Sequence, residues 1–368
     1  MSSEPDLDTY SLRKADVAEV AAPDLPYQPP TPREYKPRIA IVGAGAIAPA
    51  HLDAYRAAGW EVAAICNRTA SKAQALAEQC YPDAQVTDDL PSVLADDTID
   101  VVDITPYPEV RGPMIEAALQ AGKHVLSQKP FVLDLDEGAR LADLADAQGV
   151  KLAVNQNGRW SPHMAWMRAA VQAGLVGEVL SCHTLAHWDH TWVAGTEFDR
   201  IEDLVLYDFG IHWFDFVASI MPGRAQSVFA TATRTGDQLA KQALLAQAQI
   251  AMIGGQASLV FDGATLHGPR DTTNIVGTLG SLRSEGPDLG QQTVTLTTAE
   301  GRCSPVLRGT WFNDGFRGTM GALLVAIEDG TEPANGARAN LDSLALAFAA
   351  IASRRSGTLV KVGTVRRL

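Results

Sequence analysis

The feature that most constrains the fold is a glycine-rich segment, Gly43-Ala-Gly45-Ala-Ile-Ala48, that directly follows a short apolar run, Ile39 to Val42. In this G-x-G-x-x-A pattern the first glycine allows a tight turn, and the second lets a pyrophosphate approach the backbone. The alanine lets the next helix pack close to the strand. Free N–H groups at the start of that helix attract phosphate. The segment therefore predicts the first strand, loop and helix of a dinucleotide-binding fold.

The residues that follow continue the alternation of strands and helices. Short apolar runs predict strands at about 61–66, near 86, and at 99–104, 124–127 and 150–155. Helices are expected between them, at about 49–58, 70–80, 90–94, before 121, and at 136–148. Strands that alternate with helices at this spacing are typical of a doubly wound parallel sheet. We therefore expect an α/β Rossmann domain over residues 37–156.

From about residue 157 the pattern changes to strands in succession. Helices are expected at about 161–174 and 205–220, and strands at 178–185, 226–235, 244–253, 256–261, 273–277 and 293–298. Gly254-Gly255 stands between two of these strands and indicates a hairpin. Two last helices, at about 313–329 and 338–354, close the chain, and one of them can pack back on the first domain. Residues 157–368 are thus expected to form an α+β domain with an open, mainly antiparallel sheet.

The first 36 residues are expected to form an arm outside the two domains. Seven of the chain's 20 prolines lie within the first 37 residues. Residues 16–22 can make a short helix, whereas residues 27–37 are interrupted by proline and should be extended. Two interpretations stay open: a free tail, or an arm that lies on a neighbouring subunit or covers a cofactor.

Composition excludes several classes of function. The net charge of −13 disfavours nucleic-acid binding, because an acidic surface repels phosphate backbones. The longest apolar run, Leu344 to Ala352, is far shorter than the roughly 20 residues that a membrane span needs. The first 30 residues do not have the pattern of a signal peptide. Four scattered cysteines predict free thiols, no metal site and a cytoplasmic location.

The end of the second expected strand bears on which dinucleotide binds. An acid about 20 residues after the glycine loop normally holds the 2′-hydroxyl of the adenosine ribose. Here no acid occurs between Glu61 and Glu78. Asn67 can bond a 2′-hydroxyl without repelling a 2′-phosphate, and Arg68 and Lys72 can contact that phosphate. This pattern favours NADP, although NAD stays open because an arginine here can also stack on adenine.

Two segments farther along carry side chains suited to proton transfer. Lys129 lies just after the strand that ends at Ser127, in the crevice where such sheets bind ligands. Asp208, His212 and Asp215 stand at positions i, i+4 and i+7 of an expected helix, on one face. An imidazole can take a hydroxyl proton near neutral pH, and a carboxylate one turn away can bind a neighbouring hydroxyl. Asp215 is expected to be structural rather than catalytic.

Together these motifs resemble the glucose–fructose oxidoreductase / inositol dehydrogenase / rhizopine-catabolism (Gfo/Idh/MocA) family, from about residue 38 to residue 362. The resemblance implies that Lys129, Asp208 and His212 are catalytic, with His212 as general acid/base and the other two orienting the substrate. It also implies a cis bond between Lys129 and Pro130. The residues expected around the cofactor are Gly43, Gly45, Ala46, Ile47, Asn67, Arg68, Lys72, Thr105, Pro106, Gln128 and Lys129.

The chain departs from the family pattern beside the expected nicotinamide pocket. Gln128 stands where the family usually has a glutamate before Lys-Pro. After Thr105-Pro106, Tyr107 and Val110 stand where the family usually has asparagine and histidine. These departures bear on the pose of the substrate, whereas the lysine, aspartate and histidine are retained.

Aromatic residues and histidines gather in residues 160–213, where the substrate is expected. Five of seven tryptophans and four of eight histidines lie there. Aromatic faces suit the C–H faces of sugar rings, and an indole N–H adds a donor. His183, His187 and His190 are spaced like metal ligands, but strand geometry turns His190 to the other face, so we expect no metal. The residues expected to bind substrate are Asn157, Arg159, Trp160, Trp188 and Asp208.

We therefore expect an NAD(P)-dependent oxidoreductase that transfers a hydride between nicotinamide and a carbinol carbon of a sugar, polyol or glycoside. Two alternatives stay open: a glycosidase or lyase that works through transient oxidation by retained NAD, and a non-catalytic dinucleotide-binding regulator. The arm leaves open that the cofactor is tightly held. An open sheet face with alternating apolar residues, together with the arm, predicts a homodimer or homotetramer.

Overall fold

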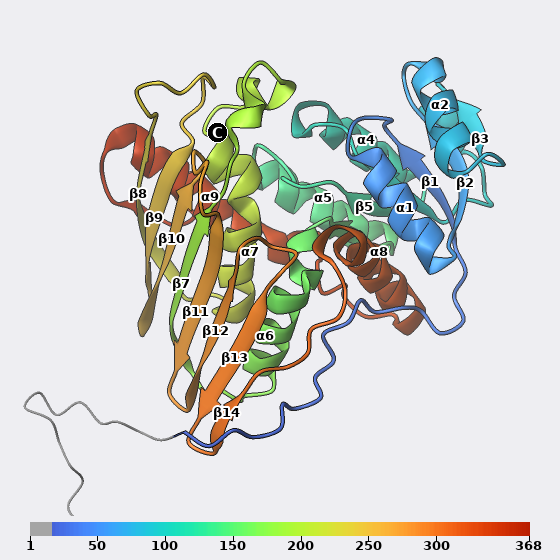
Figure 1. The fold of residues 1–368 in the computed structure, drawn as a ribbon. Helices are drawn as coiled ribbons and strands as arrows, with labels where there is room; N and C mark the ends of the chain where they lie inside the picture. The colour runs from blue at the N-terminus through green and yellow to red at the C-terminus, as the bar shows by residue number, and fades with distance from the viewer. Residues whose placement is uncertain (1–16) are drawn as a thin grey trace, which may run out of the picture.

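The computed structural model describes residues 17–368, which form two domains beside one another (Figure 1). The first contains a six-stranded parallel sheet in the order β3-β2-β1-β4-β5-β6. Its strands are β1 (Arg38–Val42), β2 (Glu61–Cys66), β3 (Gln85–Thr87), β4 (Val101–Ile104), β5 (His124–Ser127) and β6 (Leu152–Val154). Its helices are α1 (Ala48–Ala58), α2 (Ala70–Cys80), α3 (Leu90–Leu94), α4 (Pro108–Gln120) and α5 (Leu135–Gln148). The predicted doubly wound sheet is confirmed.

The strand order of this sheet fixes where a ligand can bind. The chain leaves β1 toward β2 on one side, whereas β4 pairs with β1 on the other side. A crevice forms at such a reversal, beyond the carboxyl ends of the strands. The glycine loop after β1 and Thr105 after β4 both lie there. All four residues of β4 are buried, and three of them are apolar, as expected of a central strand covered on both faces.

The second domain contains a nine-stranded sheet within the described residues, in the order β14-β13-β12-β11-β7-β10-β9-β8-β15. Its strands are β7 (Val179–His187), β8 (Ala225–Thr233), β9 (Leu245–Met252), β10 (Gly255–Asp262), β11 (Arg270–Gly277), β12 (Gly280–Gly286), β13 (Thr293–Thr298), β14 (Gly301–Cys303) and β15 (Val360–Lys361). Every pairing is antiparallel except that of β7 with β10. The expected mainly antiparallel sheet is therefore confirmed.

Helices cover the face of this sheet that is turned toward the first domain (Figure 1). They are α6 (Pro162–Gln172), α7 (Ile211–Ile220) and α9 (Ala337–Ser356). The other face is turned outward and is more polar than expected. On β9 the buried residues are Ala246, Ala248, Ile250 and Met252, and the exposed ones between them are Gln247, Gln249 and Ala251. The alternation thus places the apolar residues under the helices rather than on the open face.

Helix α8 (Trp311–Asp329) belongs to the second half of the chain but packs on the first domain. Its residues Phe316, Met320 and Leu323 share a buried cluster with Leu52 and Tyr55 of α1. The start of α8 is thereby held above the crevice. This packing positions two of its aromatic residues for the site described below.

The described part of the arm, residues 17–36, lies along its own chain (Figure 1). It is extended, so a helix over residues 17–22 is not formed, because its backbone bonds β14 instead. Val20 N donates to the Arg302 carbonyl (2.9 Å), and Arg302 N donates to the Ala18 carbonyl (2.7 Å). At its other end Arg33 N bonds the Glu328 carboxylate of α8 (2.8 Å). This corrects the expectation of a free tail for residues 17–36. That the arm also lies on a neighbouring subunit or covers a cofactor stays a prediction, and the remainder of the arm lies outside the described residues.

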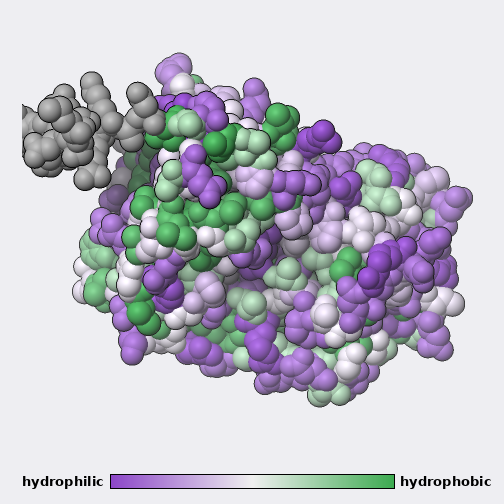
Figure 2. Space-filling model, turned by 90° about the horizontal axis from the view of Figure 1, so that it is seen from below, coloured by the Kyte–Doolittle hydropathy of each residue, from purple (hydrophilic) through white to green (hydrophobic). Residues whose placement is uncertain are grey.

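Hydrophobic side chains gather at the end of the nine-stranded sheet where the arm meets β14 (Figure 2). The exposed large apolar residues in the strands and turns at this end are Leu180, Ile253, Val276 and Leu279. Elsewhere this view is mixed or polar. Over residues 17–368, no helix combines the length and the apolar character that crossing a lipid bilayer requires.

Candidate active site

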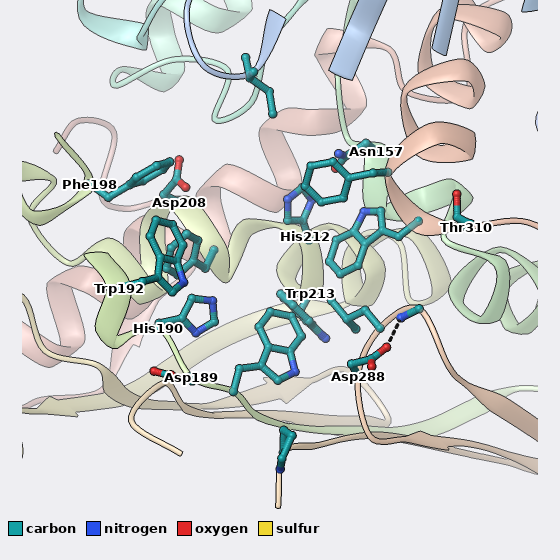
Figure 3. A pocket seen from close by; sticks show the side chains of 18 of the residues that line it. Asn157, Asp189, His190, Trp192, Phe198, Asp208, His212, Trp213, Asp288 and Thr310 are labelled. Atoms are coloured by element: carbon teal, nitrogen blue, oxygen red, sulfur yellow. Dashed lines mark hydrogen bonds between the residues drawn. The ribbon is translucent and has the colours of Figure 1, made fainter. Parts of the chain in front are cut away.

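A cavity of about 770 Å³ lies between the two domains. Ile47, Gln128 and Lys129 line it from the first domain, and side chains from α7, α8 and the loops of the nine-stranded sheet line it from the second. Figure 3 shows Asn157, Asp208 and His212 turned toward this space. The cavity therefore opens at the carboxyl ends of the parallel strands, where the strand order predicts a ligand.

Lys129 and Asp208 form an ion pair at one side of this cavity. Lys129 Nζ lies 3.1 Å from Asp208 Oδ2 and donates a hydrogen bond of 2.9 Å to the carbonyl oxygen of Asp208. The two side chains are 16% and 9% exposed, so the pair is largely shielded from water. The bond between Lys129 and Pro130 is cis, as the family resemblance implies. Of the three ammonium hydrogens, the third is left for a ligand.

Asp208 reaches the cavity from a π-helical turn that the sequence did not predict. Residues Val205–Phe209 form this turn, and Gly210 N donates to the Val205 carbonyl (2.7 Å). Helix α7 starts directly afterwards, at Ile211. Single π turns are common at functional sites because they change the direction of a side chain. Asp208 and His212 still line the same cavity, although one regular helix does not connect them.

His212 stands in the first turn of α7 beside the Lys129–Asp208 pair. Its ring meets the edge of Trp311, with ring centroids 5.5 Å apart and planes at 84°. Burial, and then the nearby Lys129 ammonium, lower the pKa of His212 well below its usual value of 6.5. The imidazole is therefore neutral at neutral pH and can accept a proton. Its Nδ1 is buried without a partner among residues 17–368, which leaves Nε2 as the nitrogen open to the cavity.

The backbone at Gly158 packs closely against His212 and leaves little room for a side chain at position 158. A Cβ added to Gly158 would lie 3.3 Å from both Cβ and Nδ1 of His212. Asn157, the residue before this glycine, lines the cavity. The predicted residues Lys129, Asn157, Asp208 and His212 are thus brought together by the structure.

Gln128 holds the backbone of Lys129 through a buried polar network. Its Oε1 accepts bonds from Lys129 N (2.7 Å) and from Asn155 Nδ2 (2.9 Å). Its Nε2 lies 3.4 Å from His51 Nε2, and His51 Nδ1 lies 2.7 Å from Asp103 Oδ2. With Nδ1–H donating to Asp103, Nε2 of His51 is the acceptor for the amides. An amide at position 128 therefore has a donor for His51 that a glutamate would lack.

Sequence reasoning missed His51, Tyr55 and Asp103. All three are fully buried, and Tyr55 donates a bond of 2.6 Å to Asp103 Oδ2. Two signals were present: His51 and Tyr55 are four residues apart on the helix after the glycine loop, and Asp103 is a lone acid within an apolar strand. A buried acid in a strand requires partners, and the residues facing it from α1 supply them.

The glycine loop has the shape that a dinucleotide requires. Gly43 has φ of +104°, and a Cβ there would collide with Oγ1 of Thr105. A Cβ on Gly45 would meet no described atom within 4 Å, so the space above it is open. At the start of α1 no described side chain caps the helix, whose N–H groups stay available to a phosphate. The predicted residues Gly43, Gly45, Ala46 and Ile47 thus surround a cradle that fits a pyrophosphate.

Asn67 is half-buried and supports this loop. Its Oδ1 accepts from Ala44 N (3.0 Å) and its Nδ2 donates to the Thr69 carbonyl (2.9 Å). The second Nδ2 hydrogen of Asn67 forms no bond within the described chain, so a contact between Asn67 and the ribose stays a prediction. Arg68 and Lys72 are exposed at the same edge, and neither forms an ion pair within the described chain.

Arg159 and Trp160 do not reach the cavity. Arg159 forms a two-bond ion pair with Asp215, at 2.6 and 2.8 Å, and the two side chains are 10% and 1% exposed. Trp160 packs against Gly318 of α8, and the guanidinium of Arg168 lies 5.5 Å from its ring centroid. These placements correct the expectation that Arg159 and Trp160 bind substrate. The turn after β6 directs Asn157 to the cavity and the next two side chains into the core.

The histidines of β7 and the residues after Pro106 lie outside the cavity. His183 and His187 are on one strand face and bond Ser258 (2.7 Å) and Asp262 (2.7 Å). No cluster of three or more metal-binding side chains occurs in residues 17–368. Tyr107 and Val110 are each 52% exposed and do not line the cavity.

Comparison with known proteins adds two matches to family sequence models. Residues 37–156 match the model described as "Oxidoreductase family, NAD-binding Rossmann fold". Residues 164–283 match the model described as "GFO/IDH/MocA C-terminal domain". The two matches follow one another in the order of the two domains.

Curated relatives match the chain over different lengths. An uncharacterized oxidoreductase of Schizosaccharomyces pombe is 31% identical over 46% of this chain, which is only 47% of its own length. A D-apiose dehydrogenase of Paraburkholderia graminis is 24% identical over 88% of this chain and 89% of its own. An inositol 2-dehydrogenase of Rhizobium meliloti is 25% identical over 86% of this chain and 96% of its own.

Solved structures share the fold. An oxidoreductase of Agrobacterium radiobacter in complex with NAD⁺, L-tartaric acid and magnesium has a TM-score of 0.79 at 21% identity, over 89% of this chain and 99% of that one. A levoglucosan dehydrogenase in complex with NADH and levoglucosan has a TM-score of 0.77 at 18% identity, over 90% and 100%.

Proposed function

This chain belongs to the Gfo/Idh/MocA family of NAD-binding oxidoreductases, and we propose that it transfers a hydride between NAD(P) and a carbinol carbon of a sugar, polyol or glycoside. The observation that carries the proposal is the grouping of Lys129, Asp208 and a neutral His212 in one cavity beside the glycine loop. The names of the D-apiose and inositol dehydrogenases among its relatives support the class of substrate.

The dinucleotide would be held by residues of the first domain. The open space at Gly45 and the uncapped start of α1 suit the pyrophosphate, and Ile47 and Gln128 line the nicotinamide end of the cavity. When bound, the nicotinamide supplies the ring carbon that takes or returns the hydride. Arg68 and Lys72, exposed where an acid is absent, support a preference for NADP over NAD.

The three catalytic side chains divide the work on one hydroxyl group. The third N–H of Lys129 donates to the reacting oxygen and orients it. Oδ1 of Asp208 accepts from a neighbouring hydroxyl, since Oδ2 faces Lys129. During oxidation the hydride leaves the carbinol carbon with both bonding electrons, and Nε2 of His212 takes the hydroxyl proton. A carbonyl remains, and the reverse steps reduce it.

Cofactor reduction by a panel of free sugars, polyols and glycosides tests this proposal. The wild type should reduce NAD(P) with at least one of them. His212→Ala should bind cofactor as tightly but lose about 10²–10⁴ of the rate. His124→Ala, at the other end of β5 from the Lys129 segment, is the matched control and should keep it. Full turnover by His212→Ala contradicts the assignment, and cleavage of a glycoside without net cofactor reduction would indicate a lyase instead.

We also expect a homodimer or homotetramer that forms through the outward face of the nine-stranded sheet, which none of the described helices covers (Figure 1). Native mass spectrometry would give the number of subunits and identify any retained cofactor. All four cysteines lie in the described chain and are free and buried, so we expect the protein to work in a reducing compartment such as the cytoplasm.

A further inference from the structure

A third of the residues that line the cavity are tryptophan or phenylalanine. We call six of its residues the aromatic wall: Trp188, Trp192, Phe198, Phe209, Trp311 and Phe312. They pack against one another as edges and tilted faces. Trp192 meets Phe198 with centroids 5.4 Å apart at 82°, and Trp188 meets Trp311 at 6.4 Å and 62°. Figure 3 shows Trp192 and Phe198 on the side of the cavity next to Asp208. The catalytic side chains therefore stand beside a broad aromatic surface.

Two of the three tryptophans of the wall, Trp188 and Trp311, present carbon rather than nitrogen to the cavity. Nε1 of Trp188 and Nε1 of Trp311 are buried and have no partner in the described part of the chain. A sugar in the cavity therefore does not find the indole donors that the sequence predicts for Trp188. The wall instead offers aromatic carbon surface, which attracts another flat apolar group.

The mouth of the cavity exposes apolar side chains to water. Trp192 is 53% exposed, Phe312 58% and Leu266 63%. All three line the cavity, so together they form an apolar rim that water reaches. Apolar surface of this kind marks a binding site, because its removal from water by an apolar ligand is favourable. A sugar ring offers such a rim only its C–H faces, so a wholly apolar group gains more from it.

The charges of the lining disfavour an acidic substrate. Among the described lining residues, Lys129 is the one fixed cation, and its charge is balanced by Asp208. Asp189 and Asp288 add two further carboxylates, which bond backbone N–H groups of Thr191 (2.9 Å) and Gly290 (2.7 Å). A substrate carboxylate or phosphate would enter an apolar site beside like charges and without a cationic partner.

We infer that this site takes a neutral glycoside with an aromatic aglycone. This rests on the proposed function: the sugar ring lies against Lys129, Asp208 and His212, and the aglycone lies on the aromatic wall. The volume is consistent with this: about 770 Å³ is in the upper part of the range for ligand cavities, and the nicotinamide would take only the end that Ile47 and Gln128 line.

The test compares phenyl and methyl β-glycosides of glucose, galactose and xylose, with phenyl β-glucuronide as the charged analogue. Binding to the cofactor-loaded protein is followed by tryptophan fluorescence, and turnover by nicotinamide absorbance. For at least one sugar, the phenyl glycoside should bind about tenfold or more tightly than the methyl glycoside, and the glucuronide should bind more weakly than phenyl glucoside. Equal binding of phenyl and methyl glycosides, absence of phenyl-glycoside binding, or preference for the glucuronide overturns the inference.

The two proposals fail separately. If methyl glycosides are oxidised and the phenyl group brings no advantage, the aglycone site is wrong and the oxidoreductase proposal stands. If phenyl glycosides bind tightly and no cofactor is reduced, the aglycone site stands and the proposed function is wrong.

Variants at the rim sharpen the test. Trp192→Ala and Leu266→Ala should each lower the ratio of phenyl-glycoside to methyl-glycoside affinity. In Trp192→Ala this ratio should approach one. Leu359→Ala is the matched control, because Leu359 is as exposed as Leu266, at 65%, and does not line the cavity. An unchanged preference in Trp192→Ala contradicts the inference.

Discussion

Replacing Arg159 by methionine should destabilise the fold rather than weaken substrate binding. Arg159 Nε and Nη2 bond the two oxygens of Asp215, at 2.6 and 2.8 Å, and Arg159 also donates to the Ala334 carbonyl. The side chains of the pair are 10% and 1% exposed, so little water can replace the guanidinium. In Arg159→Met the Asp215 carboxylate keeps Ser343 Oγ (2.8 Å) as its side-chain donor in the described chain.

The expected loss is about 3–5 kcal/mol, the cost of leaving one charge of a buried pair uncompensated. Folded proteins are stable by only about 5–15 kcal/mol, so urea unfolding should show a clear shift of the midpoint. The double variant Arg159→Met/Asp215→Leu should recover at least half of the loss, because it removes both charges. KM should stay within about threefold of wild type. A variant with the wild-type midpoint of urea unfolding and a KM raised tenfold or more would refute this reasoning and would indicate that Arg159 binds substrate.

Three further predictions concern the first domain and one buried histidine. Gly45→Ala should raise the Kd for NAD(P), measured by calorimetry, about tenfold or more and leave the unfolding midpoint unchanged. Gly43→Ala should lower the unfolding midpoint, because the φ of +104° at Gly43 and the nearby Thr105 leave no place for a Cβ. Equal effects of the two substitutions would contradict the loop geometry. Arg68→Ala should raise KM for NADP more than KM for NAD, and an equal change in both would remove the support for NADP. Burial lowers the pKa of His163 from 6.5 to about 3. Between these two pH values the unfolded chain binds a proton at His163 and the folded chain does not. The free energy of unfolding that is present above pH 6.5 is therefore partly lost as the pH falls toward about 3. At about pH 5 the loss of unfolding free energy due to His163 is about 2 kcal/mol. His163→Gln should lack this contribution to the pH dependence of stability. Identical pH dependence of stability in both proteins would refute the prediction.

The sequence predicted those parts of the site that depend on backbone spacing. The glycine loop, Lys129 and the Asp208–His212 pair follow strands or stand at helical spacing, and such positions determine which edge of a sheet a side chain occupies. The direction in which a side chain points within a turn could not be predicted from spacing. Asn157, Arg159 and Trp160 lie within four residues of sequence, yet of their side chains the short 3₁₀ turn directs only that of Asn157 to the cavity.

Contacts between distant segments were the least predictable. His51 and Asp103 are 52 residues apart, and their pairing depends on how α1 lies on β4. The arm was expected to be helical near residue 20, but an edge strand at Arg302, far away in the sequence, offered its backbone a partner. Likewise, alternating apolar residues in β9 indicated a buried face but not which face the helices would cover.

The role of His212 is tested most directly by the single-turnover rate of cofactor reduction as a function of pH, with the glycoside that the wild type oxidises best. Because burial and Lys129 lower the pKa of His212, the wild-type rate should hold well below pH 6.5 and then fall with one proton. His212→Gln should be slower by about 10²–10⁴ and should lack this acid limb. A His212→Gln protein that keeps the wild-type rate, or that shows the same acid limb, would contradict proton transfer by His212.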